Sequence, residues 1–141
     1  MKLLNLLFVF SLCSAFYLDN PKSFKIIGKK RQNISIDVKD KLELAEIKFK
    51  NTTNHEISLC WNTKQLDFPD GWDFSMCAFG KCQVGIPKKG SLKRIAPGKN
   101  GFIAIHVIPK KIKGEGVVEF ELFDSKNPQK SESVIFNVRV N

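Results

Sequence analysis

Cysteine is the most reactive side-chain type in this sequence, and three of the four cysteines, Cys60, Cys77 and Cys82, fall within residues 60–82. Four residues separate Cys77 from Cys82, and one of them is Gly80, which lets the chain double back. A disulfide at this spacing would close a short loop and contribute about 2 kcal/mol through loop entropy. The spacing therefore predicts a Cys77–Cys82 disulfide, and the alternative is a pair of buried thiols.

Cys60 has no partner in this assignment. It can be a free thiol, a link to a second chain, or the true partner of Cys77 or Cys82. A nucleophilic pair of Cys60 with His106 is conceivable, because distant residues meet in folded proteins, but no local pattern marks an activated thiol. We therefore expect that the protein is not an enzyme and has no catalytic residue.

Recognisable metal and cofactor motifs are absent from the sequence. The Cys-x4-Cys spacing, with no histidine nearby, matches no common set of zinc ligands. His55 and His106 do not stand at a recognisable spacing from Asp, Ser or Cys. We expect neither a metal nor a cofactor.

Lysine dominates the charge of the chain, which has 23 basic and 14 acidic residues and a formal net charge of +9. Specific phosphate recognition favours arginine, so this composition disfavours a nucleic-acid partner. The basic clusters fall in or beside expected loops, where they form either a solvated, soluble surface or a site for acidic glycans or anionic surfaces. The candidate polyanion-binding residues are Lys88, Lys89, Lys93, Arg94, Lys110 and Lys111, and a further basic cluster occupies 29–31.

The N-terminus has the pattern of a secretory signal peptide. A basic Lys2 precedes an apolar run that is too short to span a bilayer, and small residues at 13–15 suit cleavage after Ala15. Residues 1–15 are therefore expected to be removed, with a lead-in at 16–23 and one domain at 24–141. We expect a secreted, extracellular protein, or a periplasmic one in a bacterium, without a membrane span. Asn33 and Asn51 match the glycosylation pattern of eukaryotic secreted proteins.

The cysteines lie between two stretches with a clear strand pattern. Apolar and polar residues alternate over 57–62 and again over 72–77, as expected of half-buried strands. The sequence at 68–71, Phe-Pro-Asp-Gly, has the residues of a turn between them. We expect Trp61 and Trp72 on the core face, since an indole buries a large apolar area.

Similar short patterns recur along the rest of the chain, and no helical period is persuasive. Their number and spacing predict an all-β antiparallel sandwich of about seven to eight strands. Other strands are expected at 24–27, 34–38, 42–50, 91–95, 102–108, 117–123 and 134–140, with loops or turns at 28–33, 85–90 and 124–131.

Several motifs together resemble a known module. In order they are Phe49-Lys50-Asn51-Thr52, a strand with a core Trp, Pro-x-Gly-Trp, the Cys pair, Ile95-Ala96-Pro97-Gly98, a strand ending at Pro109, and Gly116 before a strand ending Phe123-Asp124. Over residues 34–141 this order resembles the immunoglobulin-like modules of secreted bacterial proteins, notably those preceding sorting domains in Bacteroidetes. It is similar more loosely to the sandwich modules of extracellular glycosidases.

This resemblance implies a single immunoglobulin-like β-sandwich with a non-catalytic accessory or adhesive role. The expected function is a secreted binding or adhesion module whose partner is an unknown macromolecule, either a protein or an acidic glycan. One alternative is polyanion binding through the lysine-rich loops. The alternative from another functional class is an enzyme that uses a Cys60 thiolate.

Overall fold

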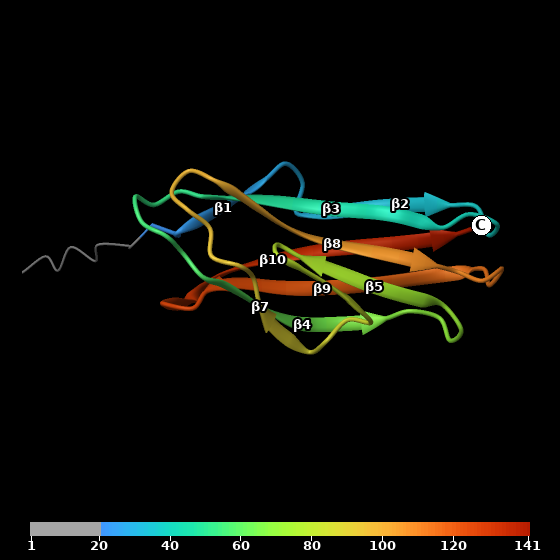
Figure 1. The fold of residues 1–141 in the computed structure, drawn as a ribbon. Helices are drawn as coiled ribbons and strands as arrows, with labels where there is room; N and C mark the ends of the chain where they lie inside the picture. The colour runs from blue at the N-terminus through green and yellow to red at the C-terminus, as the bar shows by residue number, and fades with distance from the viewer. Residues whose placement is uncertain (1–20) are drawn as a thin grey trace, which may run out of the picture.

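The computed structural model describes residues 21–141, apart from the side chain of Glu43, and the residues described form strands and loops without a helix. Figure 1 shows the strands running along the length of the molecule. The ten strands are β1 (Phe24–Ile27), β2 (Arg31–Ile36), β3 (Leu42–Asn51), β4 (Leu59–Asp67), β5 (Asp73–Ala78), β6 (Lys81–Val84), β7 (Lys89–Ser91), β8 (Asn100–Ile108), β9 (Gly114–Asp124) and β10 (Asn127–Val140).

The strands form two sheets of five, in the orders β1-β3-β8-β5-β6 and β2-β10-β9-β4-β7. We call these the first and the second sheet. All neighbouring strands are antiparallel except β2 and β10, which pair in parallel from Arg31↔Ile135 to Ile36↔Val140. This parallel pair arises because the chain leaves the edge of the first sheet after β1 and joins the edge of the second. The predicted all-β sandwich is confirmed, with this one departure from antiparallel pairing.

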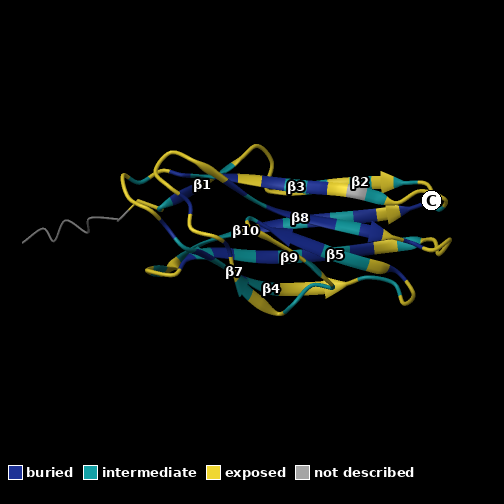
Figure 2. Ribbon diagram, viewed as in Figure 1, coloured by how far each residue is buried: buried dark blue, intermediate teal, exposed yellow. Residues whose placement is uncertain are grey.

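The hydrophobic core lies between the two sheets, where Figure 2 shows the buried residues. It forms because alternate residues of each long strand are apolar, so that one face of every strand is removed from water. Phe120 and Phe136 are fully buried neighbours whose rings meet edge to face. Trp61 and Trp72 are both in the core, as predicted, with 3% and 4% of their surface exposed.

The strand boundaries differ from the predicted ones where the residues are polar. β2 begins at Arg31, inside the expected loop, because its outward positions face solvent on an edge strand. The strand expected at 91–95 is wrong: β7 covers Lys89–Ser91, and residue 95 makes only an isolated bridge. The expected turn at 124–131 is also shorter, because β10 already begins at Asn127.

The predicted signal peptide, residues 1–15, and residues 16–20 of the lead-in lie outside the described residues. Within 21–141 there is no helix with the length and apolar character needed to cross a membrane.

Candidate functional site

A disulfide joins Cys77 to Cys82, as the sequence predicts. The two cysteines are directly opposite each other on β5 and β6, with a distance of 4.0 Å between their Cα atoms. The turn between them depends on Gly80, whose φ of 97° favours glycine. A side chain at Gly80 would also meet Lys93, because an added Cβ would lie 2.7 Å from the Cβ of Lys93. The disulfide therefore closes a hairpin at the edge of the first sheet.

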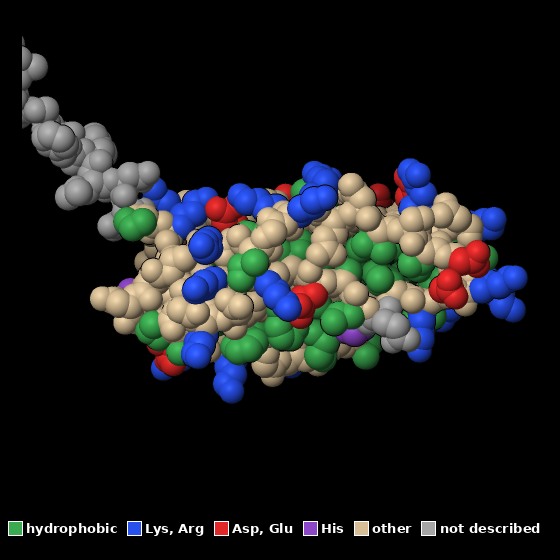
Figure 3. Space-filling view, turned by 90° about the horizontal axis from the view of Figure 1, so that it is seen from above, with side chains coloured by type: hydrophobic (Ala, Val, Ile, Leu, Met, Phe, Trp, Pro, Cys, Tyr) green, Lys and Arg blue, Asp and Glu red, His purple; other side chains and the backbone are tan. Residues whose placement is uncertain are grey.

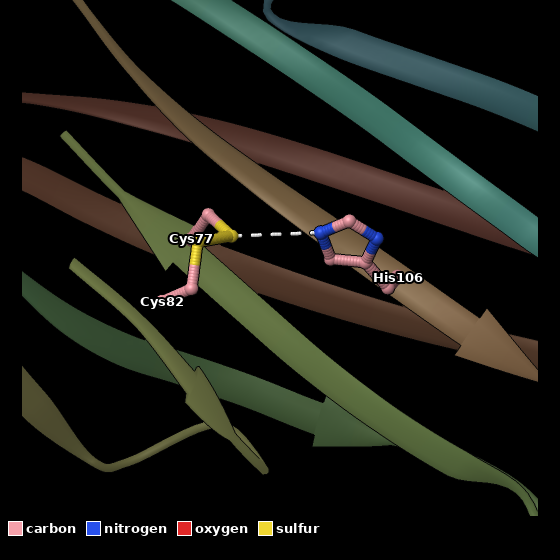
Figure 4. Close-up of a disulfide and its surroundings, with 3 residues drawn as sticks. All are labelled: Cys77, Cys82 and His106. Carbon is pink, nitrogen blue, oxygen red and sulfur yellow. Dashed lines mark hydrogen bonds between the residues drawn. A yellow bond between two sulfur atoms is a disulfide. The ribbon is translucent and has the colours of Figure 1, made fainter. Parts of the chain in front are cut away.

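His106 lies beside this disulfide. Ile105 and Val107 are buried on the core side of β8, so His106 points to the outer face of the first sheet. Its Nε2 atom is 3.5 Å from Sγ of Cys77 (Figure 4). Exposure of the two cysteines differs: Cys77 is only 8% exposed, whereas Cys82 is exposed on the edge strand. The sulfur of Cys77 thus faces the imidazole of His106, whereas Cys82 faces solvent.

Aliphatic side chains surround the disulfide and His106 on the same outer face. The exposed side chains are Val84 at 95%, Leu44 at 51% and Ile108 at 46%. Strand register places Leu44 and Ile108 near His106, because the bulge of β3 that contains Leu44 lies opposite His106, and Ile108 is two residues further along β8. Val84 lies on β6, on the other side of β5, where Ser75 pairs with His106. Ala104, the next outward residue on β8, is buried without being part of the core. We call Leu44, Val84, His106 and Ile108 the apolar patch.

The rim of this face is mainly basic on the β1 and β3 side. Lys25 and Lys50 are paired residues of these strands, and Lys48 follows on β3. Lys48 also forms an ion pair with Glu46 at 3.2 Å. Figure 3, which views the molecule from above, shows Lys and Arg side chains along the edges and among the hydrophobic side chains.

Cys60 is a free cysteine on the opposite outer face of the sandwich. It belongs to β4 in the second sheet, and its neighbours Leu59 and Trp61 point into the core. The conceivable pairing of Cys60 with His106 is not formed, because the two side chains lie on outer faces of different sheets. Partial burial, and secondly the Asp124 carboxylate, raise the pKa of the Cys60 thiol. Both effects disfavour the reactive thiolate.

The structure does not bring the six candidate polyanion-binding residues together. Lys88 and Lys89 lie beside β4, where the Lys88 carbonyl accepts from the Thr63 N–H and Lys89 is opposite Asn62. These contacts place the pair at the edge of the second sheet.

Lys93 and Arg94 lie elsewhere. The Lys93 N–H donates to the carbonyl of Phe79 at 2.8 Å, which places this lysine beside the turn of the disulfide hairpin. Arg94 forms an exposed ion pair with Glu56 at 3.4 Å.

Lys110 and Lys111 form the turn between β8 and β9, with φ values of 52° and 66°. The ammonium group of Lys110 is 2.7 Å from Asp73. The two lysines border a groove of about 770 Å³ together with the β2–β3 loop. That loop contributes Lys39 and Lys41 to the groove, and also Asp37 and Asp40.

The two glycosylation patterns have different surroundings. Asn51 is fully buried, and its Nδ2 donates to the carbonyls of His55 and Ile95, each at 2.8 Å. This nitrogen holds a turn together and cannot carry a glycan in the fold. Asn33 is exposed on β2, and its Oδ1 accepts from Nδ2 of Asn137.

Among residues 21–141, there is no group of three His, Cys, Asp or Glu side chains arranged to hold a metal ion. His55 is exposed in the turn after β3, where its ring contacts Asn54. Sequence reasoning missed the apolar patch and the Cys77–His106 contact. The alternation along β8 could have revealed part of the patch, because it places His106 and Ile108 on the face away from the core.

No protein-family model matches this chain. No curated protein matches its sequence. Among solved structures, it is similar to the N-terminal domain of PorA, with 16% identity and a TM-score of 0.57 over 84% of this chain and 97% of that one. It is also similar to PapD-like domain 7 of human CEP192, with 10% identity and a TM-score of 0.55 over 100% of this chain and 96% of that one. The chain therefore shares with these two domains the architecture of an immunoglobulin-like β-sandwich.

Proposed function

We propose that this chain is a non-catalytic binding module of an oxidising compartment that docks a protein partner on the outer face of the first sheet. The observation that carries the proposal is the apolar patch. Exposed aliphatic side chains scattered singly are ordinary on protein surfaces, whereas a contiguous set marks an interaction site. Val84 is almost fully exposed, and about half of the surface of Leu44 and of Ile108 is exposed on the same face.

Two observations support an oxidising compartment. The chain contains a Cys77–Cys82 disulfide, and disulfides persist mainly in extracellular and periplasmic proteins. The sequence of residues 1–15 also has the pattern of a secretory signal.

The apolar and basic side chains of this face indicate what kind of partner surface would fit it. A protein with an aliphatic centre and an acidic rim would complement the patch and the adjacent Lys25, Lys48 and Lys50. A second copy of this chain would bring like charges together and is disfavoured. The two indoles, which are the best platforms for stacking on a glycan ring, are buried in the core. Phe79 and Phe102 are half-buried and pack edge to face against each other, with ring centroids 6.0 Å apart.

The geometry around Cys60 supports the competing hypothesis of a thiol-dependent enzyme less well. A thiol nucleophile requires a base within hydrogen-bond distance and a low pKa. Cys60 has neither feature, since the imidazole of His106 lies on the other sheet and burial raises the thiol pKa.

Site-specific photo-crosslinking tests the proposed interface. A photoreactive residue replaces Val84, and a matched probe replaces Gln65, which is exposed on β4 of the second sheet. In the extracellular or periplasmic fraction of the source, the Val84 probe should give one discrete protein adduct that the Gln65 probe does not give. Leu44→Lys with Ile108→Lys should abolish the adduct while the thermal transition is retained. Equal adducts at both positions, or no adduct at Val84, would overturn the proposal.

Polyanion binding is a second candidate function, and one specific observation favours it. The groove between the β2–β3 loop and the β8–β9 turn gathers Lys39, Lys41, Lys110 and Lys111 on one end of the sandwich. Grooves lined by one sign of charge concentrate the opposite charge. Asp37 and Asp40 in the same groove reduce this effect, which makes it the weaker candidate.

A further inference from the structure

We propose that the Cys77–Cys82 disulfide is a redox site, which accepts two electrons from the dithiol of a partner protein by thiol–disulfide exchange. This inference goes beyond the proposed docking function and does not depend on it, because dithiols of any size can test the disulfide directly. It rests on the access to Cys82, on the position of His106, and on the small structural role of the bond.

The first argument is access. An attacking thiolate must approach one sulfur of a disulfide from outside the protein. Cys82 is exposed on β6, which is the end strand of the first sheet among the described residues and pairs with β5. Cys77 is nearly buried, so the approach is one-sided. Attack at Cys82 makes Cys77 the leaving sulfur.

The second argument is that the leaving sulfur already has a polar partner. Nε2 of His106 is 3.5 Å from Sγ of Cys77. Figure 4 draws this contact, and an N–H at this position would stabilise the departing thiolate by donating a hydrogen bond to it. Among residues 21–141, this sulfur is the hydrogen-bond partner of the His106 ring.

The third argument is that the bond stabilises the fold less than a cross-link between distant segments would. It joins residues with a sequence separation of 5, and β5 and β6 are already paired through Met76↔Gln83 and Ala78↔Lys81. Short loops gain the least from a cross-link, because the unfolded chain loses little entropy when they close. The bond can therefore open while the sandwich stays folded.

The exchange balances as follows. A partner thiolate attacks Sγ of Cys82 and forms a mixed disulfide, while the Cys77–Cys82 bond breaks and Cys77 leaves as a thiolate that accepts a hydrogen bond from His106 and takes a proton from solvent. The partner's second thiolate then attacks its own sulfur in the mixed disulfide and releases Cys82. The products are two thiols in this chain and one disulfide in the partner. The partner dithiol is oxidised, and the Cys77–Cys82 bond is reduced.

The test measures reduction of the native full chain by dithiothreitol and by a thioredoxin-type dithiol protein, with free thiols counted by mass after alkylation. We expect reduction whose rate rises in proportion to dithiol concentration, with no change in the circular dichroism of the sandwich. A dithiol protein that has lost its second cysteine should be trapped as a mixed disulfide on Cys82. A rate that levels off at the rate of global unfolding, or a trapped adduct on Cys77, would overturn the proposal.

Two histidine variants separate the role of His106 from general effects. His106→Gln should slow reduction several-fold at neutral pH while the thermal transition is preserved. His55→Gln removes the other histidine, which is exposed in a turn remote from the disulfide in the sequence, and should leave the rate unchanged. Equal rates in all three proteins would remove His106 from the exchange step.

Discussion

The backbone of Gly90 lies against the indole of Trp61, so that a Cβ added to Gly90 would lie 2.2 Å from Cη2 of the ring. The two residues are paired on β7 and β4. Trp61 is buried in the core and its ring is rigid, so it cannot move aside to make room. The glycine is therefore required for β7 to join the edge of the second sheet.

Gly90→Ala should lower the free energy of unfolding by about 1–3 kcal/mol, the usual range for overpacking a filled site. Chemical denaturation measures this change. Ser91→Ala, at the exposed neighbouring position on β7, is the control and should change stability by less than about 0.5 kcal/mol. Combining Gly90→Ala with Trp61→Phe should cost less than the sum of the single changes, because the smaller ring leaves room for the methyl group. A neutral Gly90→Ala variant would show that the contact is not a close one.

Cys60 should react slowly with thiol reagents in the native protein. Burial, and secondly the charge of Asp124, raise the pKa of its thiol, so the thiolate fraction at neutral pH is smaller than that of a free cysteine. The alkylation rate should therefore keep rising with pH beyond the point where a free cysteine levels off.

An Asp124→Asn variant should lower this pKa part of the way and speed the alkylation of Cys60 at neutral pH. The substitution keeps an oxygen that can accept the hydrogen bond from the Lys126 N–H, which is 3.0 Å long. Asp67→Asn, at an exposed position on the same strand as Cys60, is the control. Fast alkylation of the unmodified protein at neutral pH would contradict the raised pKa and revive the enzyme hypothesis.

The contacts of Glu132 with two lysines should make the free energy of unfolding fall as the pH becomes acidic. Partial burial opposes ionisation of its carboxyl group, but hydrogen bonds from Lys22 and Lys30 outweigh it, so the pKa is lowered. A carboxyl group whose pKa is lower in the folded state adds stability above its unfolded pKa, and this stability is lost as the pH falls through the folded pKa.

Glu132→Gln should therefore cost up to about 1 kcal/mol at neutral pH, a typical limit for ion pairs with exposed lysines. The difference from the unmodified protein should vanish in acid and shrink with added salt. Glu56→Gln removes an exposed ion pair with Arg94 and serves as the control, with a smaller effect expected. Chemical denaturation at neutral and at acidic pH gives the free energy of unfolding of each variant. A loss of stability in Glu132→Gln that persists in acid would rule out the ion-pair explanation.

The groove at the β8–β9 turn should hold anionic polymers more strongly than the other basic clusters. Retention on heparin should fall steeply with salt, because each neutralised charge releases a counterion. Lys39→Glu with Lys111→Glu should lower the salt concentration at elution more than Lys88→Glu with Lys89→Glu, which lie beside β4. If both pairs change elution equally, the positive charge acts as a diffuse solubility feature.

The sequence was sufficient to predict the parts of the fold that depend on local pattern. Alternation around Trp61 and Trp72 placed both indoles in the core, and the spacing of Cys77 and Cys82 predicted their disulfide. These features need only a period of two and a short loop. By contrast, Lys81–Val84 is only four residues long and mostly exposed, so its short alternation is a weak signal. Its pairing with β5 defines this edge strand.

The contacts in the candidate site depend on the register between paired strands, which cannot be read from the sequence. Cys77 and His106 are 29 positions apart, and they meet because β5 pairs with β8 so that Cys77 is opposite Ala104 and Ser75 is opposite His106. The same reason explains why the basic clusters could not be assigned to one surface. Their positions depend on where the β6–β7 and β8–β9 connections leave the sandwich.

The parallel pairing of β2 with β10 also determines how the domain responds to mechanical tension. The described chain enters at one end of the sandwich, and Asn141 follows β10 at the other end (Figure 1). Once β1 has been pulled away, force applied at the two ends draws β2 and β10 along each other in opposite directions. The six residue pairs from Arg31↔Ile135 to Ile36↔Val140 then bear the load together in shear, rather than separating one by one as in a hairpin that is unzipped.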